Sequence, residues 1–204
     1  MKAIAEKITL YLVQNNYIES SKQKWCVYFL QKKMLTVCSS IMFLIIGFFN
    51  NHLFETILFV WSFTSLRKRT GGFHLKSAFS CLIMSSLIVL LLPQFLSYIY
   101  LLNKYTVVLL LTVCCFVICV YSPVNHPNIH FNNEEMQKNK QYAIKTLVFI
   151  ISGIIILTVV KQLSLANSIV LAVLYDAVFI IIAKITGQEV KNNGYERKNQ
   201  ICSN

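Results

Sequence analysis

His74 and Cys81 are the residues of this chain whose types and spacing most directly suggest chemistry. A cysteine thiolate is a strong nucleophile, and a nearby imidazole can take the proton of the thiol or protonate a leaving group. On one straight helix, residues at this spacing are separated by about 10 Å of rise, which is beyond the hydrogen-bond reach of such a pair. Gly71 and Gly72 lie just before the histidine, and glycines allow the backbone to bend sharply. The motif therefore predicts nucleophilic catalysis, on the condition that the glycines break the helix.

The other cysteines have a different setting. Cys26 and Cys202 fall in segments predicted to be cytoplasmic, where stable disulfides are not expected. No CxxC pair is followed by a matching His or Cys pair, so we expect no metal site and no cofactor. Cys81 alone has a histidine and a basic cluster just upstream, and nearby cations favour the reactive thiolate. The remaining four cysteines lie in apolar runs, where a thiol usually behaves as a small hydrophobe: Cys38, Cys114, Cys115 and Cys119.

The composition predicts an integral membrane protein. Hydrophobic residues make up 56% of the 204 residues, charged residues 13%, and the mean hydropathy is +0.59, well above the usual balance of a soluble domain. Several apolar runs approach the roughly 20 residues that a helix needs to cross the hydrocarbon core. We expect an all-α, polytopic fold with six transmembrane helices, over residues 34–49, 53–66, 78–102, 107–121, 143–160 and 163–185. The second run is the weakest, because it is short and carries Glu55.

The basic residues give an independent indication of topology. Seventeen of the nineteen Lys and Arg residues fall before the first run, between the second and third, between the fourth and fifth, or after the sixth, if Lys145 and Lys184 at the ends of the fifth and sixth runs are counted with the adjoining loops. Only Lys104 and Lys161 lie in the alternate loops. Lys and Arg are retained on the cytoplasmic side, so the pattern predicts six spans with cytoplasmic N- and C-termini and supports the weak second span. The same rule accounts for the net charge of +11, and no nucleic-acid-binding module is recognisable.

The chain divides into three parts. Residues 1–33 form a cytoplasmic or interfacial amphipathic segment, residues 34–185 the six-helix transmembrane catalytic domain, and residues 186–204 a polar cytoplasmic tail. The first segment has no apolar core of a cleavable signal peptide. Its apolar residues recur at helical spacing among lysines, which fits a helix lying on the membrane surface and equally a helix packed on the cytoplasmic ends of the spans.

Asp176 is a carboxylate inside the last apolar run. Ionisable groups are costly in hydrocarbon and usually face a partner or a cavity. Its expected depth is close to that of Cys81, so three roles are open: orienting His74, pairing with a cation of the basic loop, or a structural hydrogen bond to another helix. Glu55 is expected near the opposite surface.

Two stretches resemble a known family. Residues 67–74, Arg-Lys-Arg-Thr-Gly-Gly-Phe-His, together with Cys81, resemble the signature of the accessory gene regulator B family, AgrB, membrane endopeptidases that process quorum-sensing propeptides. Residues 122–128, Ser-Pro-Val-Asn-His-Pro-Asn, are similar to the loop that follows the fourth span in that family. Chain length and expected topology agree, so the resemblance extends over nearly the whole chain.

The resemblance implies a function in the bacterial cytoplasmic membrane. Cys81 would be the nucleophile and His74 its base, with Arg67 and Gly72 as supporting positions. The substrate would be an AgrD-like propeptide with an amphipathic leader, a central signal sequence and an acidic C-terminal tail. Removal of the tail through an acyl-enzyme would permit closure of a thiolactone or lactone ring. The resemblance also leads us to expect a homodimer.

Several neighbouring residues have two readings. Arg67, Lys68, Arg69 and Lys76 flank the reactive pair and suit contacts with an acidic tail, or they determine topology only. Gly71, with Gly72, is expected to bend the chain, and Pro123 and Asn125 belong to a segment assigned to substrate recognition or packing.

The alternative to a peptidase is a small membrane transporter or a non-catalytic membrane scaffold, in which His74 and Cys81 only pack. A transporter would more often have inverted repeats or interrupted helices that meet at the middle of the membrane.

Overall fold

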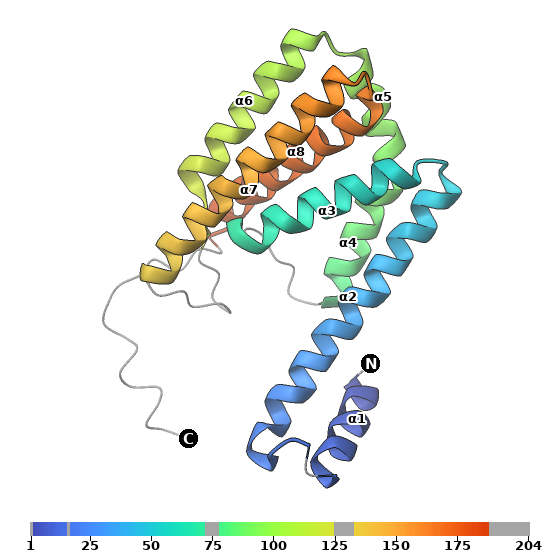
Figure 1. The fold of residues 1–204 in the computed structure, drawn as a ribbon, viewed down its shortest axis with the longest axis vertical. Helices are drawn as coiled ribbons and strands as arrows, with labels where there is room; N and C mark the ends of the chain where they lie inside the picture. The colour runs from blue at the N-terminus through green and yellow to red at the C-terminus, as the bar shows by residue number, and fades with distance from the viewer. Residues whose placement is uncertain (1, 16, 72–77, 125–132, 188–204) are drawn as a thin grey trace.

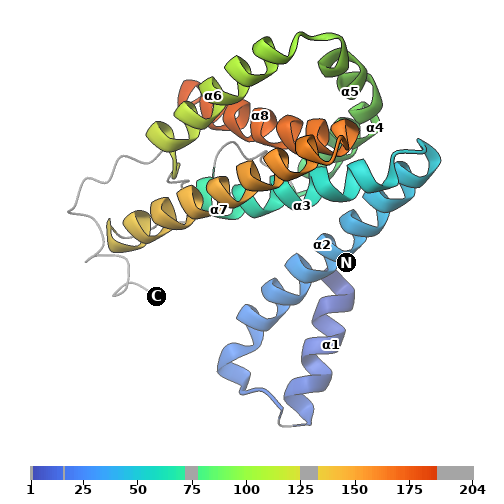
Figure 2. The ribbon, with the colours of Figure 1, turned by 45° about the horizontal axis from the view of Figure 1, so that its top comes forward.

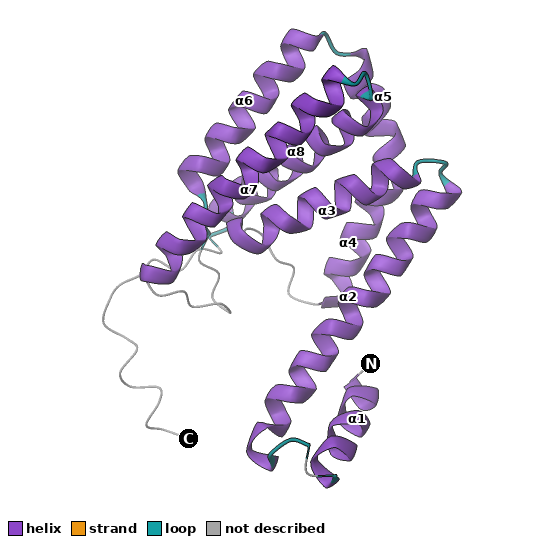
Figure 3. Ribbon diagram, viewed as in Figure 1, coloured by secondary structure: helices purple, strands orange, loops and turns teal. Residues whose placement is uncertain are grey.

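The computed structural model describes residues 2–15, 17–71, 78–124 and 133–187, and every regular element within these ranges is helical (Figures 1 and 3). The all-α prediction is confirmed for this part of the chain. In chain order, the elements are α1 (Lys2–Gln14), the short 3-10 helix η1 (Ser20–Lys22), α2 (Gln23–Phe49), α3 (Leu53–Thr70), α4 (Ala78–Leu90), α5 (Leu92–Leu101), α6 (Lys104–Tyr121), α7 (Asn133–Val159) and α8 (Leu163–Ile185).

The helices define a multi-pass membrane protein. Within the described residues, α2, α6, α7 and α8 are long and apolar enough to cross a membrane, and α4 with α5 makes a fifth span if the pair counts as one. The expected second span corresponds to α3, which does not meet the same criterion. It carries Glu55 in its first turn and Arg67, Lys68 and Arg69 in its last. Four or five crossings are therefore supported by length and composition, compared with the six expected.

The third apolar run is divided into two helices. It was expected to be one span over residues 78–102, but Leu82–Leu90 and Leu92–Leu101 meet at an angle of 47°. Pro93 lies in the first turn of α5. Proline has no backbone N–H, and its ring collides with the preceding helical turn, so a straight continuation of α4 is disfavoured at this point.

α8 is the central helix of the bundle. In its most apolar window 61% of residues are buried, compared with 22% or less for the other candidate spans. It packs against α3, α5, α6 and α7 (Figure 2). Many of its buried residues are small, and small side chains let neighbouring helices approach closely: Ala166, Ser168, Ala172, Ala177 and Ala183.

α1 and the first half of α2 project from this bundle as an arm (Figures 1 and 2). The two helices pack against each other, and Ala5, Thr9 and Cys26 are buried. The helix α2 begins at Gln23, well before the apolar run at residue 34. Large apolar side chains on both helices stay exposed, as expected of an amphipathic segment next to a membrane.

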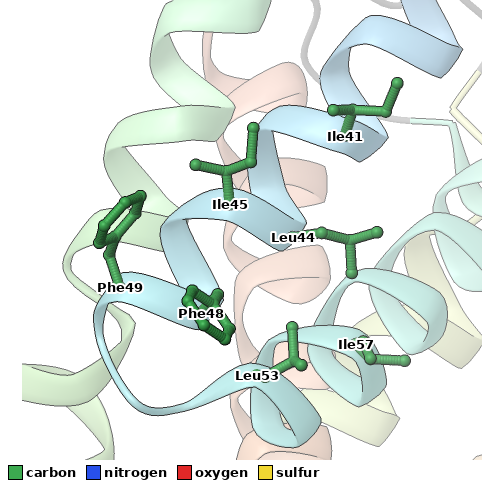
Figure 4. A pocket seen from close by; sticks show the side chains of 7 residues that line it. All are labelled: Ile41, Leu44, Ile45, Phe48, Phe49, Leu53 and Ile57. Carbon is green, nitrogen blue, oxygen red and sulfur yellow. The ribbon is translucent and has the colours of Figure 1, made fainter.

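A shallow groove lies where α2 turns into α3 (Figure 4). Its lining contains no polar side chain, so it offers no group for catalysis and suits contact with lipid chains. The lining residues are Ile41, Leu44, Ile45, Phe48, Phe49, Leu53 and Ile57.

Candidate functional site

The C-terminal end of α3 is where the predicted helix break occurs. The helix ends at Thr70, and Gly71 follows with a φ of 69° and a ψ of −133°, a conformation that residues with a side chain rarely adopt. Arg67, Lys68 and Arg69 fill the last turn, where cations stabilise the negative end of the helix dipole. The chain therefore does not continue α3 straight towards α4, and Cys81 belongs to the separate helix α4.

Gly71 is also required by a close contact with the second motif. A Cβ atom at this position would lie 2.6 Å from the carbonyl oxygen of Val124. The backbone N–H of Val124 donates a hydrogen bond of 2.8 Å to the carbonyl oxygen of Thr70. Ser122, Pro123 and Val124 are all buried. The two stretches that resemble the family thus meet in space, at the end of α3.

Asp176 lies beneath this junction, on α8. Its side chain is fully buried, with 0% exposure, and Oδ1 lies 3.0 Å from Oγ1 of Thr70, which donates to it. The same hydroxyl lies 3.1 Å from the carbonyl oxygen of Leu66. A carboxylate is the stronger acceptor of the two. Among the described residues, Oδ2 of Asp176 has no hydrogen-bond partner.

Arg67 lies beside Thr70 and Asp176 at the C-terminal end of α3. The central carbon of its guanidinium lies 4.9 Å from the centroid of the Phe179 ring, within the range of a cation–π contact. The guanidinium also attracts the Asp176 carboxylate electrostatically. Arg67 and Thr70 are three residues apart on α3, and Asp176 and Phe179 three apart on α8, so each pair lies on one helical face.

The neighbouring cations Lys68 and Arg69 are exposed. The guanidinium carbon of Arg69 lies 4.7 Å from the ring centroid of Tyr142 on α7, and the ammonium of Lys145 lies 5.8 Å from the same centroid. These two cations share one aromatic ring beside the candidate site. They remain accessible to a solvent-borne or membrane-bound partner, whereas Arg67 is partly buried.

The predicted reactive pair is only partly covered by the structure. His74 lies outside the described residues, as do Gly72, Lys76 and Asn125. The backbone of Cys81 lies in the first half of α4, but its side chain is outside the described part. The dyad therefore remains a prediction from sequence.

Two residues of the junction were not singled out from the sequence. Thr70 and Val124 stand within the two motifs, but neither side chain is of a type that suggests chemistry. Their importance comes from contacts between residues distant in the chain. Asp176 was noticed because a carboxylate in an apolar run is unusual.

No group of three or more potential metal ligands occurs within the described ranges. The polar residues of the junction combine one carboxylate, one guanidinium and hydroxyl groups. Such a set suits hydrogen bonding and charge stabilisation rather than metal binding.

The fold and this junction define a multi-pass helical membrane protein with a polar cluster at one end of its central helix pair. The sequence matches the accessory gene regulator B family, AgrB, over residues 5–183. The chain belongs to that family, and the family links it to the processing of quorum-sensing peptides, with an AgrD-type propeptide as substrate. No match was found among the curated proteins or the solved structures.

Proposed function

We propose that this protein is a membrane cysteine endopeptidase that removes the acidic C-terminal tail of an AgrD-like propeptide. The observation that carries the proposal is the family match over residues 5–183, which includes the Arg67 to Cys81 stretch. The helix break at Gly71 supports it, because a break is the condition under which His74 can approach Cys81.

The chemistry follows from the reactivity of a thiol. The Cys81 thiolate attacks the carbonyl that joins the signal sequence to the tail, and the His74 imidazolium protonates the leaving amine. The C–N bond breaks, the tail leaves with a free amino group, and the rest of the propeptide stays on Cys81 as a thioester. A cysteine of the signal sequence then attacks this thioester, which forms a thiolactone and regenerates the thiolate. A serine in its place gives a lactone.

Water must be kept from the thioester, because hydrolysis would release a linear peptide. The N-terminal part of α4 follows the polar junction and leads into apolar sequence. A nucleophile at such a boundary is partly shielded from solvent, which favours ring closure over hydrolysis.

We further propose that α3 crosses the membrane, which gives six crossings with cytoplasmic termini. Near its start, Glu55 accepts a hydrogen bond from Ser164 near the start of α8. At its end, Thr70 bonds Asp176 in the second half of α8. The two helices therefore run in the same direction, and the charges of α3 lie at its two ends, where the interfaces would be. We place the protein in the bacterial cytoplasmic membrane, as a homodimer.

The test is co-expression with an AgrD-like propeptide that carries an amphipathic leader, a central Cys and an acidic tail. Removal of the tail is followed by mass spectrometry of membranes. Cys81→Ala and His74→Ala should abolish removal, whereas Cys38→Ala, which deletes an exposed thiol of α2, should not change it. Tail removal by either of the first two variants at the rate of the unmodified protein would refute the peptidase.

A further inference from the structure

Thr70 connects three parts of the molecule. It is the last residue of α3, and it is buried. Its carbonyl oxygen accepts the N–H of Val124 at 2.8 Å, and its hydroxyl donates to Oδ1 of Asp176 at 3.0 Å. One residue thus ties α3 both to α8 and to the segment after α6.

The buried carboxylate is not needed for packing. Replacing buried ionic groups by apolar residues of similar size is often neutral or stabilising, and a carboxylate inside a membrane span is costly. Asp176 nevertheless lies buried in the second half of α8, with one oxygen bonded to Thr70 and the Arg67 guanidinium attracting it. Such a directional contact specifies position in a way that an apolar contact does not.

The place of the contact in the chain shows what it can position. Gly71 follows Thr70 directly, and His74 lies four residues beyond Thr70. Any rotation or fraying of the last turn of α3 changes the direction in which this segment leaves the helix. The Asp176 contact opposes such movement from α8, the candidate span with the largest buried share among those described.

We propose that Thr70 and Asp176 are positioning residues for the reaction of Cys81. Their hydrogen bond fixes the end of α3 and thereby the departure point of the segment that carries His74. This inference rests on the proposed function, because it assigns the bond an effect on acylation of Cys81 by the propeptide.

A matched contact exists at the other end of the same helix pair. Ser164 of α8 donates to Glu55 of α3 at 2.7 Å, which is also a hydroxyl–carboxylate bond between these two helices. It lies at the start of α3, far from Gly71 along the helix. Its loss tests whether any weakening of the α3–α8 contact has the same effect.

The experiment compares Thr70→Val, Thr70→Ser, Asp176→Asn and Ser164→Ala in the full chain, in proteoliposomes with the same AgrD-like propeptide. Valine keeps the shape of threonine without the hydroxyl, and serine keeps the hydroxyl. Single-turnover tail removal gives the acylation rate, and its dependence on propeptide concentration gives the apparent affinity. Alkylation of Cys81 by iodoacetamide between pH 5 and 9 (about the range that spans the ordinary pKa values of His and Cys), followed by peptide mass spectrometry, gives thiolate reactivity without any propeptide.

We expect Thr70→Val to lower the acylation rate about tenfold or more, with apparent affinity within about twofold of the unmodified protein, since a misplaced catalytic group affects the reaction more than binding. Cys81 alkylation near pH 6 should fall with it. The acylation rates of Thr70→Ser and Ser164→Ala should stay within about threefold of that of the unmodified protein. Asp176→Asn retains an acceptor for Thr70, so its acylation rate should lie between those of Thr70→Val and Thr70→Ser.

Two results would overturn the positioning role. The first is that Thr70→Val and Asp176→Asn both keep the acylation rate of the unmodified protein. The second is that Ser164→Ala lowers the acylation rate as much as Thr70→Val does. If Thr70→Val does not fold, Asp176→Asn and the alkylation profile decide the question. Failure of the proposed function has a different result, since Cys81→Ala would then remove the tail as fast as the unmodified protein.

Discussion

The two ends of the α3–α8 pair use the same kind of bond in different surroundings. At one end, the Thr70 hydroxyl and the Asp176 carboxylate are both buried. At the other, the exposed Ser164 donates to Glu55, whose side chain is 16% exposed, and Nδ1 of His52 lies 3.5 Å from the same carboxylate oxygen. A buried bond has no water to replace it when it is broken. We therefore expect the buried Thr70 bond to fix the geometry of its end of the helix pair more strictly than the Glu55 bond does at the other end.

The largest effect is expected from substitution of Gly71. Gly71→Ala should lower the free energy of unfolding by about 2–6 kcal/mol, because backbone strain of about 1–3 kcal/mol adds to an overpacking cost of similar size against Val124. Thermal unfolding in detergent measures it. Gly187→Ala is the control, since Gly187 also has a positive φ, of 64°, but no atom of the described residues lies within 4 Å of its Cβ position. Equal losses for the two variants would mean that the close contact with Val124 is not a constraint.

The next effect distinguishes two arginines of one helical turn. Arg67→Met should cost about 2 kcal/mol, because it removes a half-buried cation from the Phe179 ring and from the field of Asp176. Arg69→Met should cost about 0.5–1 kcal/mol, since its contact with Tyr142 is exposed. The same unfolding measurement applies. A larger loss of unfolding free energy for Arg69→Met would show that the exposed contact with Tyr142 stabilises the C-terminal end of α3 more than the contacts of Arg67 do.

The hydroxyl groups at the two ends provide the direct comparison. Thr70→Val leaves a buried carboxylate oxygen without its donor and should cost about 1–3 kcal/mol. Ser164→Ala should cost at most about 1 kcal/mol, because Ser164 is exposed and Glu55 is only partly buried. Unfolding midpoints of the two variants, purified in the same detergent, give the difference. Equal costs would contradict the distinction between the two ends.

The smallest effect is expected from the partly buried Glu55 carboxylate, whose side chain is 16% exposed. Glu55→Gln keeps an acceptor for Ser164 and removes only the charge facing His52. Because ion pairs that solvent can reach contribute about 0–1 kcal/mol and are screened by salt, the unfolding midpoint should change little and the change should shrink at high salt. A shift that exceeds that of Arg67→Met would mean that Glu55 has a role not accounted for by this contact.

Some parts of the fold could be predicted from the sequence with good reason. The last apolar run, residues 163–185, coincides with α8, because this helix is central, free of basic residues until its last turn, and uninterrupted by proline. The break at Gly71 was predicted from two glycines. Hydropathy does not locate the end of a helix that continues into polar residues. The second apolar run was expected to end at residue 66, whereas α3 continues through its basic last turn to Thr70.

Other parts could not be predicted because they depend on contacts between distant residues. The bond between Thr70 and Asp176 joins positions 106 residues apart, and no local pattern records such a pair. Pro93 was visible, but the continuous apolar run around it gave no indication of the 47° bend. The sequence identified Asp176 as unusual, and only the packing of α8 against α3 supplied its partner.

The most direct test of the account is detection of the acyl-enzyme on Cys81. The full chain in proteoliposomes is mixed with the AgrD-like propeptide in which the signal Cys is replaced by Ala, so that ring closure cannot release the thioester. The reaction is quenched in acid at successive times, and the masses of the peptides that contain Cys81 are measured by mass spectrometry. We predict a transient adduct on Cys81 with the mass of leader plus signal sequence, which forms as the tail is released and forms more slowly in Thr70→Val. Release of the tail while Cys81 stays unmodified at every time point would contradict the account.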